Sequence, residues 1–174
     1  MRWDALSAPA EKIALAQALV QVTSRRLWGE SALREGAMQT FHDRDRWRSV
    51  FPERSREAIW FISEVSDASM RAAFDAAPAA GMEQVIAERL AQNADLKPFV
   101  RRVMLFDVTH PMQALGRMQR TAGVMLACVR APRRRVTALN LAYTLIVFVW
   151  LLDFSRSGAV TRPATRTLMR LIGL

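Results

Sequence analysis

The sequence predicts an all-α protein of about nine helices, and three observations support this fold class. Glycine and proline occur only seven times each among 174 residues, whereas residues that favour helices, such as alanine, leucine and arginine, are abundant. Apolar residues make up 51% of the chain, which is enough to bury a core and argues against disorder. Apolar positions recur at helical spacing, and neither strand-like alternation nor an internal repeat is present.

Four helices are expected in the first half of the chain. The first covers residues 8–28, and Ser31 then caps a short second helix. A third helix is expected over residues 42–51. Pro52 interrupts the chain, and a long amphipathic helix follows over residues 53–76, with apolar positions recurring every three or four residues.

Five more helices are expected after a linker that is rich in alanine, proline and glycine, at residues 77–81. The apolar positions of each recur at helical spacing, and a basic loop at 130–135 separates the third of them from the fourth. The expected positions are, in chain order, around 85–90, around 99–106, from 111 to 129, from 137 to 154, and a last helix that Thr161 caps.

The helix at 137–154 contains the longest apolar run, from residue 139 to residue 152. Fourteen helical residues rise about 21 Å, which is less than the hydrocarbon core of a bilayer, so we expect a core helix rather than a membrane span. Nearly every face of this helix is hydrophobic. One side is therefore expected to pack in its own domain, and the other against a partner subunit or an apolar ligand.

The inventory of reactive residues predicts a protein without catalytic activity. Cys128 is the only cysteine, and the two histidines, His42 and His110, lie in unrelated segments. No nucleophile motif, phosphate-binding glycine loop or metal-spaced cluster is present, so neither a metal nor a cofactor is expected. The N-terminal residues lack the pattern of a signal peptide, which predicts a cytoplasmic protein. The net charge of +9 suits partners that carry phosphate groups.

The expected helices occur in a characteristic order: three short helices, a long helix, and a ligand domain that ends in two apolar helices. Five stretches of the sequence are also distinctive: LWGESALREGAM (27–38), FPERSREAIWFISEVSDASM (51–70), HPMQALGRMQRTAG (110–123), WLLDFS (150–155) and TRTLMRLI (165–172). In these stretches and in this order the chain resembles the accessory family of ubiquinone (coenzyme Q) biosynthesis that is usually called COQ-nine, which has the fold of TetR-type regulators.

The resemblance implies a TetR-like fold with a degenerate helix-turn-helix. Residues 1–52 would form the N-terminal helical region, and residues 53–174 would form the lipid-binding and dimerisation domain. The protein would bind an isoprenoid quinone precursor or a similar lipid and present it to a hydroxylase of the ubiquinone pathway. Two features depart from the family: an arginine-rich segment at 130–135 replaces a hydrophilic stretch, and the family's C-terminal amphipathic membrane helix is not found before Leu174.

Three groups of candidate residues follow. Large and adaptable apolar side chains are candidates for the lipid pocket: Trp60, Phe61, Val65, Met104, Phe106, Met112, Met118, Ala122, Met125, Tyr143, Val147 and Trp150. Candidates for a homodimer interface are Val147, Leu151, Leu168 and Leu171. Candidates for contact with an anionic membrane, at whose inner face the protein would be peripheral, are Arg133, Arg134, Arg135, Arg162, Arg166 and Arg170.

Two other functions remain open. One is a TetR-type transcriptional regulator with an apolar ligand, in which Arg44, Arg46 and Arg48 would meet DNA. Sequence-specific DNA binding is not expected, because the bulky Phe41 occupies the turn where such regulators use glycine, and because the neighbouring Asp43 would repel phosphate. The other function is a structural dimer module without a ligand.

Overall fold

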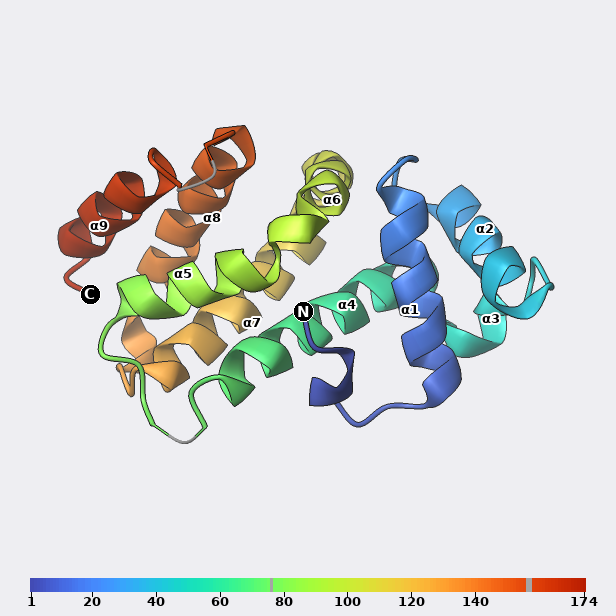
Figure 1. The fold of residues 1–174 in the computed structure, drawn as a ribbon, viewed down its shortest axis with the longest axis horizontal. Helices are drawn as coiled ribbons and strands as arrows, with labels where there is room; N and C mark the ends of the chain where they lie inside the picture. The colour runs from blue at the N-terminus through green and yellow to red at the C-terminus, as the bar shows by residue number, and fades with distance from the viewer. Residues whose placement is uncertain (76, 156–157) are drawn as a thin grey trace. The chain divides into compact units, whose positions relative to one another are not determined.

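The computed structural model describes residues 1–75, 77–155 and 158–174. Within these ranges all regular structure is helical, with nine α-helices, three short 3-10 helices and no strand. The prediction of an all-α protein with about nine helices is therefore confirmed. Figure 1 shows the helices in chain order. The chain divides into two compact units, and each unit is built from two separate stretches of sequence.

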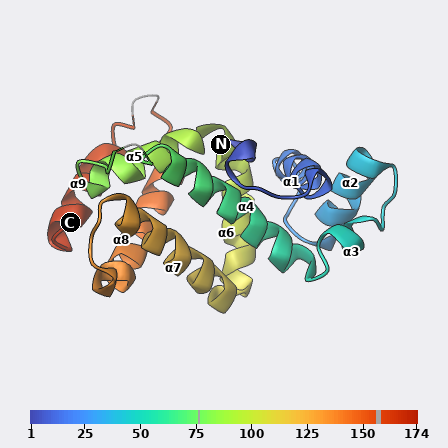
Figure 2. The ribbon, with the colours of Figure 1, turned by 90° about the horizontal axis from the view of Figure 1, so that it is seen from below.

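The first unit contains residues 1–66 and 95–114. Its α1, α2 and α3 lie together in Figures 1 and 2. Apolar side chains from all three helices and from α4 are fully buried in one cluster, which includes Leu19, Leu33, Trp47 and Ile59. The helices of this unit are α1 (Ala10–Thr23), α2 (Glu30–Phe41), α3 (Trp47–Val50), the first part of α4 (Arg54–Ala72), α6 (Lys97–Thr109) and the first residues of α7 (Pro111–Cys128).

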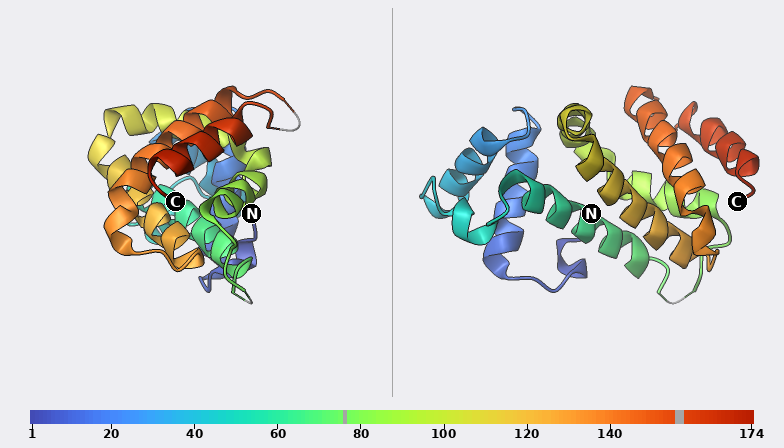
Figure 3. Two further views of the ribbon diagram at one scale, coloured as in Figure 1. Left: turned by 90° about the vertical axis from the view of Figure 1, so that its left-hand side faces the viewer. Right: turned by 180° about the vertical axis from the view of Figure 1, so that it is seen from behind.

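The second unit contains residues 67–94 and 115–174. Its α8 and α9 lie side by side in Figures 1 and 3. Its fully buried side chains include Ile86, Met125, Leu139, Ile146 and Met169. The helices of this unit are the end of α4, α5 (Met82–Gln92), most of α7, the 3-10 turn Arg133–Arg135, α8 (Val136–Leu152) and α9 (Thr161–Leu171).

The third helix is shorter than the sequence indicates. A helix was expected over residues 42–51, but α3 is the single turn Trp47–Val50. The chain turns at His42, whose φ of 56° is left-handed and ends α2. The carboxylate of Asp43 then accepts the backbone N–H of Asp45 at 2.9 Å, which stabilises a turn in place of helix.

Two helix N-termini differ from the predicted capping. Gly29, not Ser31, precedes α2, and its φ of 153° is a conformation that glycine adopts without a side-chain clash. Thr161 does not cap α9; it is the first residue of that helix. The cap is the carboxylate of Asp153, whose Oδ2 accepts the backbone N–H groups of Val160 and Thr161 at 3.1 and 2.8 Å. A short-range sequence pattern does not reveal this cap, because Asp153 lies eight residues before Thr161.

Two further boundaries bear on the domain organisation. The long helix α4 ends at Ala72, and Ala76, its expected last residue, lies outside the described residues. Helix α4 contributes residues to both compact units, since the boundary between them falls after Ser66. A division at residues 52 and 53 remains a prediction.

Candidate functional site

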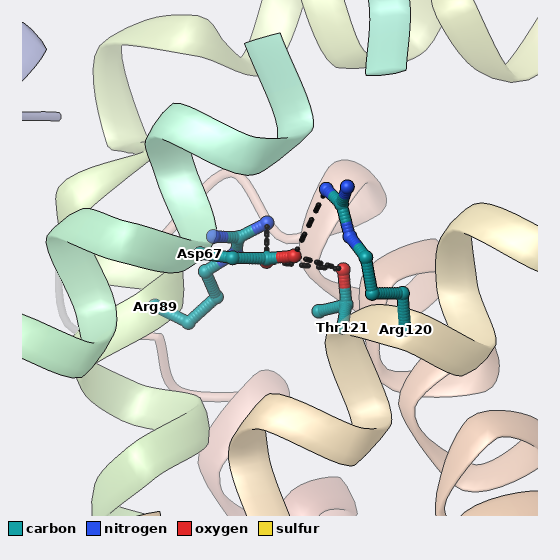
Figure 4. A network of polar contacts seen from close by, with 4 residues as sticks. All are labelled: Asp67, Arg89, Arg120 and Thr121. Atoms are coloured by element: carbon teal, nitrogen blue, oxygen red, sulfur yellow. Dashed lines mark hydrogen bonds and ion pairs between the residues drawn. The ribbon is translucent and has the colours of Figure 1, made fainter. Parts of the chain in front are cut away.

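The second unit contains a buried polar cluster around Asp67, which lies on α4 (Figure 4). Arg89 of α5 pairs with it, with 2.9 Å between Nη2 and Asp67 Oδ1. Arg120 of α7 approaches the other carboxylate oxygen, with 3.3 Å between its Nη2 and Asp67 Oδ2. The hydroxyl of Thr121 donates to both oxygens, at 3.0 and 3.2 Å. One carboxylate therefore joins three helices of this unit.

Burial makes this cluster sensitive to the loss of either Asp67 or Arg89. The side chains of Asp67 and Arg89 are only 6% and 7% exposed, whereas that of Arg120 is 26% exposed. Tyr143 of α8 lies near Arg89, and burial raises the pKa of its hydroxyl, an effect that the charge of Arg89 partly opposes. Tyr143 is therefore neutral at physiological pH. These polar contacts connect α4, α5 and α7, and no local sequence pattern indicates them.

Helix α8 has one buried side and one exposed apolar side. Leu139, Ile146 and Trp150 are among its buried side chains. The exposed side chains recur at spacings of four, three and four residues, which places them along one face of a helix. These are Leu141, Leu145, Phe148 and Leu152, which are between 49% and 72% exposed and are named here the α8 stripe.

Positive charge is concentrated in the same part of the chain. Residues 115–174 contain ten arginines and a single acidic residue, Asp153, so this segment carries a net charge of +9, equal to that of the whole chain. Three further apolar side chains of the unit are strongly exposed, namely Phe154, Val160 and Leu171. The second unit thus combines exposed apolar side chains with a large excess of arginine.

The candidate membrane arginines lie in different environments. Arg133, Arg134, Arg162 and Arg170 are exposed to solvent. Arg135 is half-buried and donates to the backbone carbonyl of Gly173. Arg166 is exposed but pairs with Glu83 of α5, with 3.6 Å between Arg166 Nε and Glu83 Oε2. Five of the six are therefore exposed, although Arg166 is partly neutralised.

The twelve lipid-pocket candidates are divided equally between the two units. Most are core side chains: Phe61 and Val65 are buried in the core of the first unit, and Met125 is fully buried in the second unit. Met112, in contrast, is largely exposed. The first unit holds Trp60, Phe61, Val65, Met104, Phe106 and Met112, and the second holds Met118, Ala122, Met125, Tyr143, Val147 and Trp150. Their role in lipid binding remains a prediction.

The dimer candidates are also placed differently from one another. Val147 and Leu151 are buried within their own chain, Leu168 is half-buried, and only Leu171 is well exposed. The apolar face that α8 offers to a partner is the α8 stripe, which is not among the residues predicted for the interface. Its spacing is present in the sequence, but it cannot be recognised there because the remaining faces of α8 are apolar as well.

The three arginines of the predicted DNA-binding segment do not share one helix. Arg44 and Arg46 precede α3, and Arg48 lies on its single turn. Arg46 forms an ion pair with Glu11, with 3.1 Å between Nη2 and Oε2, and Arg48 pairs with Asp45 at 3.5 Å. The left-handed residue of this turn is His42, whereas the turn was expected at the preceding residue, Phe41. A single helical turn cannot present several side chains to base edges as a recognition helix does.

Comparison with known proteins identifies no relative. No protein-family model, curated protein or solved structure matches the chain. The resemblance to the COQ-nine family and to TetR-type regulators therefore stays a prediction.

Proposed function

We propose that this protein is a non-enzymatic lipid-binding accessory protein with a TetR-like fold, which binds at the surface of an anionic membrane. It would take up an isoprenoid quinone precursor or a similar lipid and present it to a hydroxylase of ubiquinone biosynthesis. The observation that supports lipid contact is the α8 stripe, four large apolar side chains that are each about half or more exposed to solvent. The identity of the lipid and of the hydroxylase follows from the sequence resemblance alone.

Charge favours a membrane over a second copy of this chain as the surface that covers the α8 stripe. Two identical second units would each bring a strongly basic segment to the assembly, because residues 115–174 carry a net charge of +9. An anionic bilayer complements both features, because it accepts apolar side chains and attracts arginines by about 1 kcal/mol each. We therefore place the α8 stripe against lipid, and a homodimer through α8 and α9 is the competing outcome.

Helix α8 could also be considered as a membrane span. The segment Arg133–Leu152 is long and apolar enough to cross a bilayer by length and composition, but 44% of its most apolar window is buried inside the chain. Spanning would remove Leu139, Ile146 and Trp150 from the core that they complete. Contact through the exposed stripe preserves that core, and for this reason we propose peripheral binding.

Vesicle co-sedimentation with matched variants tests the membrane proposal. Phe148→Ser and Leu145→Ser each remove an apolar side chain of the α8 stripe, and Leu105→Ser removes an equally exposed leucine of α6 as the control. Both stripe variants should bind vesicles that contain one-third phosphatidylglycerol several-fold less tightly than wild type, whereas the control should bind as wild type does. Equal binding by all four proteins would refute the proposal.

Two further measurements separate the alternatives. Mass spectrometry of an organic extract of the purified protein should reveal a bound isoprenoid lipid, and a structural module would yield none. Carbonate at high pH should release the protein from membranes, because it strips peripheral proteins and leaves spanning ones.

A TetR-type regulator remains the second candidate, since Arg44 makes no ion pair or side-chain hydrogen bond within the described residues and faces solvent. DNA protection at about 150 mM salt tests this function. A sharp footprint on one sequence would favour the regulator, whereas binding that vanishes as salt rises indicates only the non-specific attraction of a basic protein.

A further inference from the structure

The first unit contains a surface hollow that the proposed lipid function does not use. Its volume is about 600 Å³, which falls in the range of small-molecule sites. Four of the eight residues that line it are arginines. The lining residues are Arg26, Ser31, Arg34, Glu35, Met38, Arg44, Asp45 and Arg48, and together they are named here the arginine hollow.

Three parts of the chain bring these arginines together. Ser31, Arg34, Glu35 and Met38 follow one another at spacings of three, one and three residues, so they share one face of α2. Arg26 follows the end of α1. After α2 the turn at His42 reverses the chain and returns Arg44, Asp45 and Arg48 to the same hollow.

The carboxylates around the hollow do not neutralise its arginines. Arg26 pairs with Glu35, with 2.8 Å between Nε and Oε2, and Arg48 pairs more loosely with Asp45, at 3.5 Å. Arg34 pairs with Glu30, which does not line the hollow. Arg44 has no ion pair within the described residues. Four guanidinium groups against two carboxylates give the lining a net charge of +2.

We infer that the arginine hollow binds a small molecule that carries a phosphate or diphosphate group. Guanidinium groups present N–H donors in a planar fork that matches phosphate oxygens, and the ion pairs of the hollow are solvent-exposed, so exchanging them for a phosphate costs little. The volume exceeds that of a phosphate group alone, which leaves room for an organic portion against Met38 and the arginine stems. No aromatic ring lines the hollow, so stacking of a nucleic-acid base is not expected.

Calorimetric titration with inorganic pyrophosphate, at about 150 mM sodium chloride, tests this inference on the full chain. Arg44→Gln and Arg34→Gln should each raise the dissociation constant about tenfold, because each removes a charged donor to the anion. Arg25→Gln is the matched control: Arg25 is exposed, adjoins Arg26 and does not line the hollow. It should leave the dissociation constant unchanged, and circular dichroism should show the same helix content in all variants.

Two outcomes would overturn the inference. If Arg25→Gln weakens pyrophosphate binding as much as Arg44→Gln, or if neither does, the hollow has no specific affinity for phosphate. If a 20-base-pair DNA duplex binds more tightly than pyrophosphate in the same salt, and Arg44→Gln weakens that binding at least as much, the arginines form a nucleic-acid surface instead. Vesicle binding by Arg44→Gln should equal that of wild type. The inference about the hollow and the membrane proposal can therefore be refuted separately.

Discussion

Replacing Asp67 with asparagine should destabilise the second unit severely. The change keeps the size of the side chain but removes the carboxylate that pairs with Arg89 and Arg120. Arg89 is buried, so it would keep its positive charge without the compensating negative charge. A guanidinium group stays protonated in proteins, so the loss of a proton cannot relieve this cost.

The expected loss of stability follows from the burial of Asp67 and Arg89 and from the distance between their charged atoms. Unit charges about 4 Å apart attract by about 4 kcal/mol at an effective dielectric constant near 20, and desolvation offsets much of that gain while the pair is intact. Removing one partner leaves the desolvation cost uncompensated, so a loss of about 3–5 kcal/mol in the free energy of unfolding is expected for Asp67→Asn. For a chain of this size each kcal/mol lowers Tm by about 2–4 °C.

Urea unfolding followed by circular dichroism measures this loss, and hydrogen exchange locates it. Because the chain has two compact units, the transition need not be two-state, so amide protection in α5 and α7 is the more specific readout. Arg120→Gln is the control, since that side chain is 26% exposed and its pairing is partly screened. Arg120→Gln should lower the free energy of unfolding by about 1 kcal/mol or less.

A loss below 1 kcal/mol for Asp67→Asn, with protection in α5 and α7 unchanged, would refute the reasoning. A second variant keeps the test informative if Asp67→Asn fails to fold. Changing Asp67 to Leu together with Arg89 to Met replaces the buried pair by apolar side chains, and such replacements are often neutral or stabilising. This double variant should therefore fold and exceed Asp67→Asn in stability.

Three other predictions follow from the second unit. Changing Arg162, Arg166 and Arg170 together to Gln should weaken binding to anionic vesicles by tenfold or more and leave binding to neutral vesicles unchanged, in a co-sedimentation assay. Asp153 has a pKa well below its usual range because Ser155 and Thr161, the first residue of α9, donate to its carboxylate. Its contribution to stability is therefore present above the unfolded pKa near 4 and is lost as pH falls further. Asp153→Asn should lower Tm by a few degrees at pH 7 and by less at pH 3. If the α8 stripe binds lipid rather than a second copy, sedimentation of wild type and of Phe148→Ser at micromolar concentration should show the same mass.

The helices were predictable from the sequence because their apolar periodicity is local. The order and number of α-helices, and the long α4, followed from spacing alone. The short length of α3 did not, because the chain leaves α2 through the left-handed His42, five residues before α3 begins, and histidine adopts this conformation only in particular contexts. The Asp67 cluster was equally hidden, since its partners lie 22 to 54 residues away in the sequence.

The faces of α8 show a different limit of sequence reasoning. Periodicity identifies a buried face only where apolar and polar positions alternate, and α8 has almost no polar positions to provide that contrast. Val147 and Leu151 were therefore assigned to an interface, although the structure buries both in their own chain. Glutamate at either position would disrupt the fold of a monomer, so it cannot report on dimerisation. Substitutions in the α8 stripe can report on dimerisation, because those side chains are exposed.

Salt dependence can separate the two contributions to the proposed membrane contact. The first unit is close to charge balance, with 13 basic and 11 acidic residues, whereas residues 115–174 carry the net charge of the chain. Screening at 1 M salt, where the Debye length is about 3 Å, should remove most of the arginine attraction but not the burial of the α8 stripe. Binding of wild type to anionic vesicles should therefore fall with salt to a residual level, which Phe148→Ser should reduce further. Binding that vanishes completely at high salt would mean that arginines alone hold the protein on the membrane and that the α8 stripe faces something else.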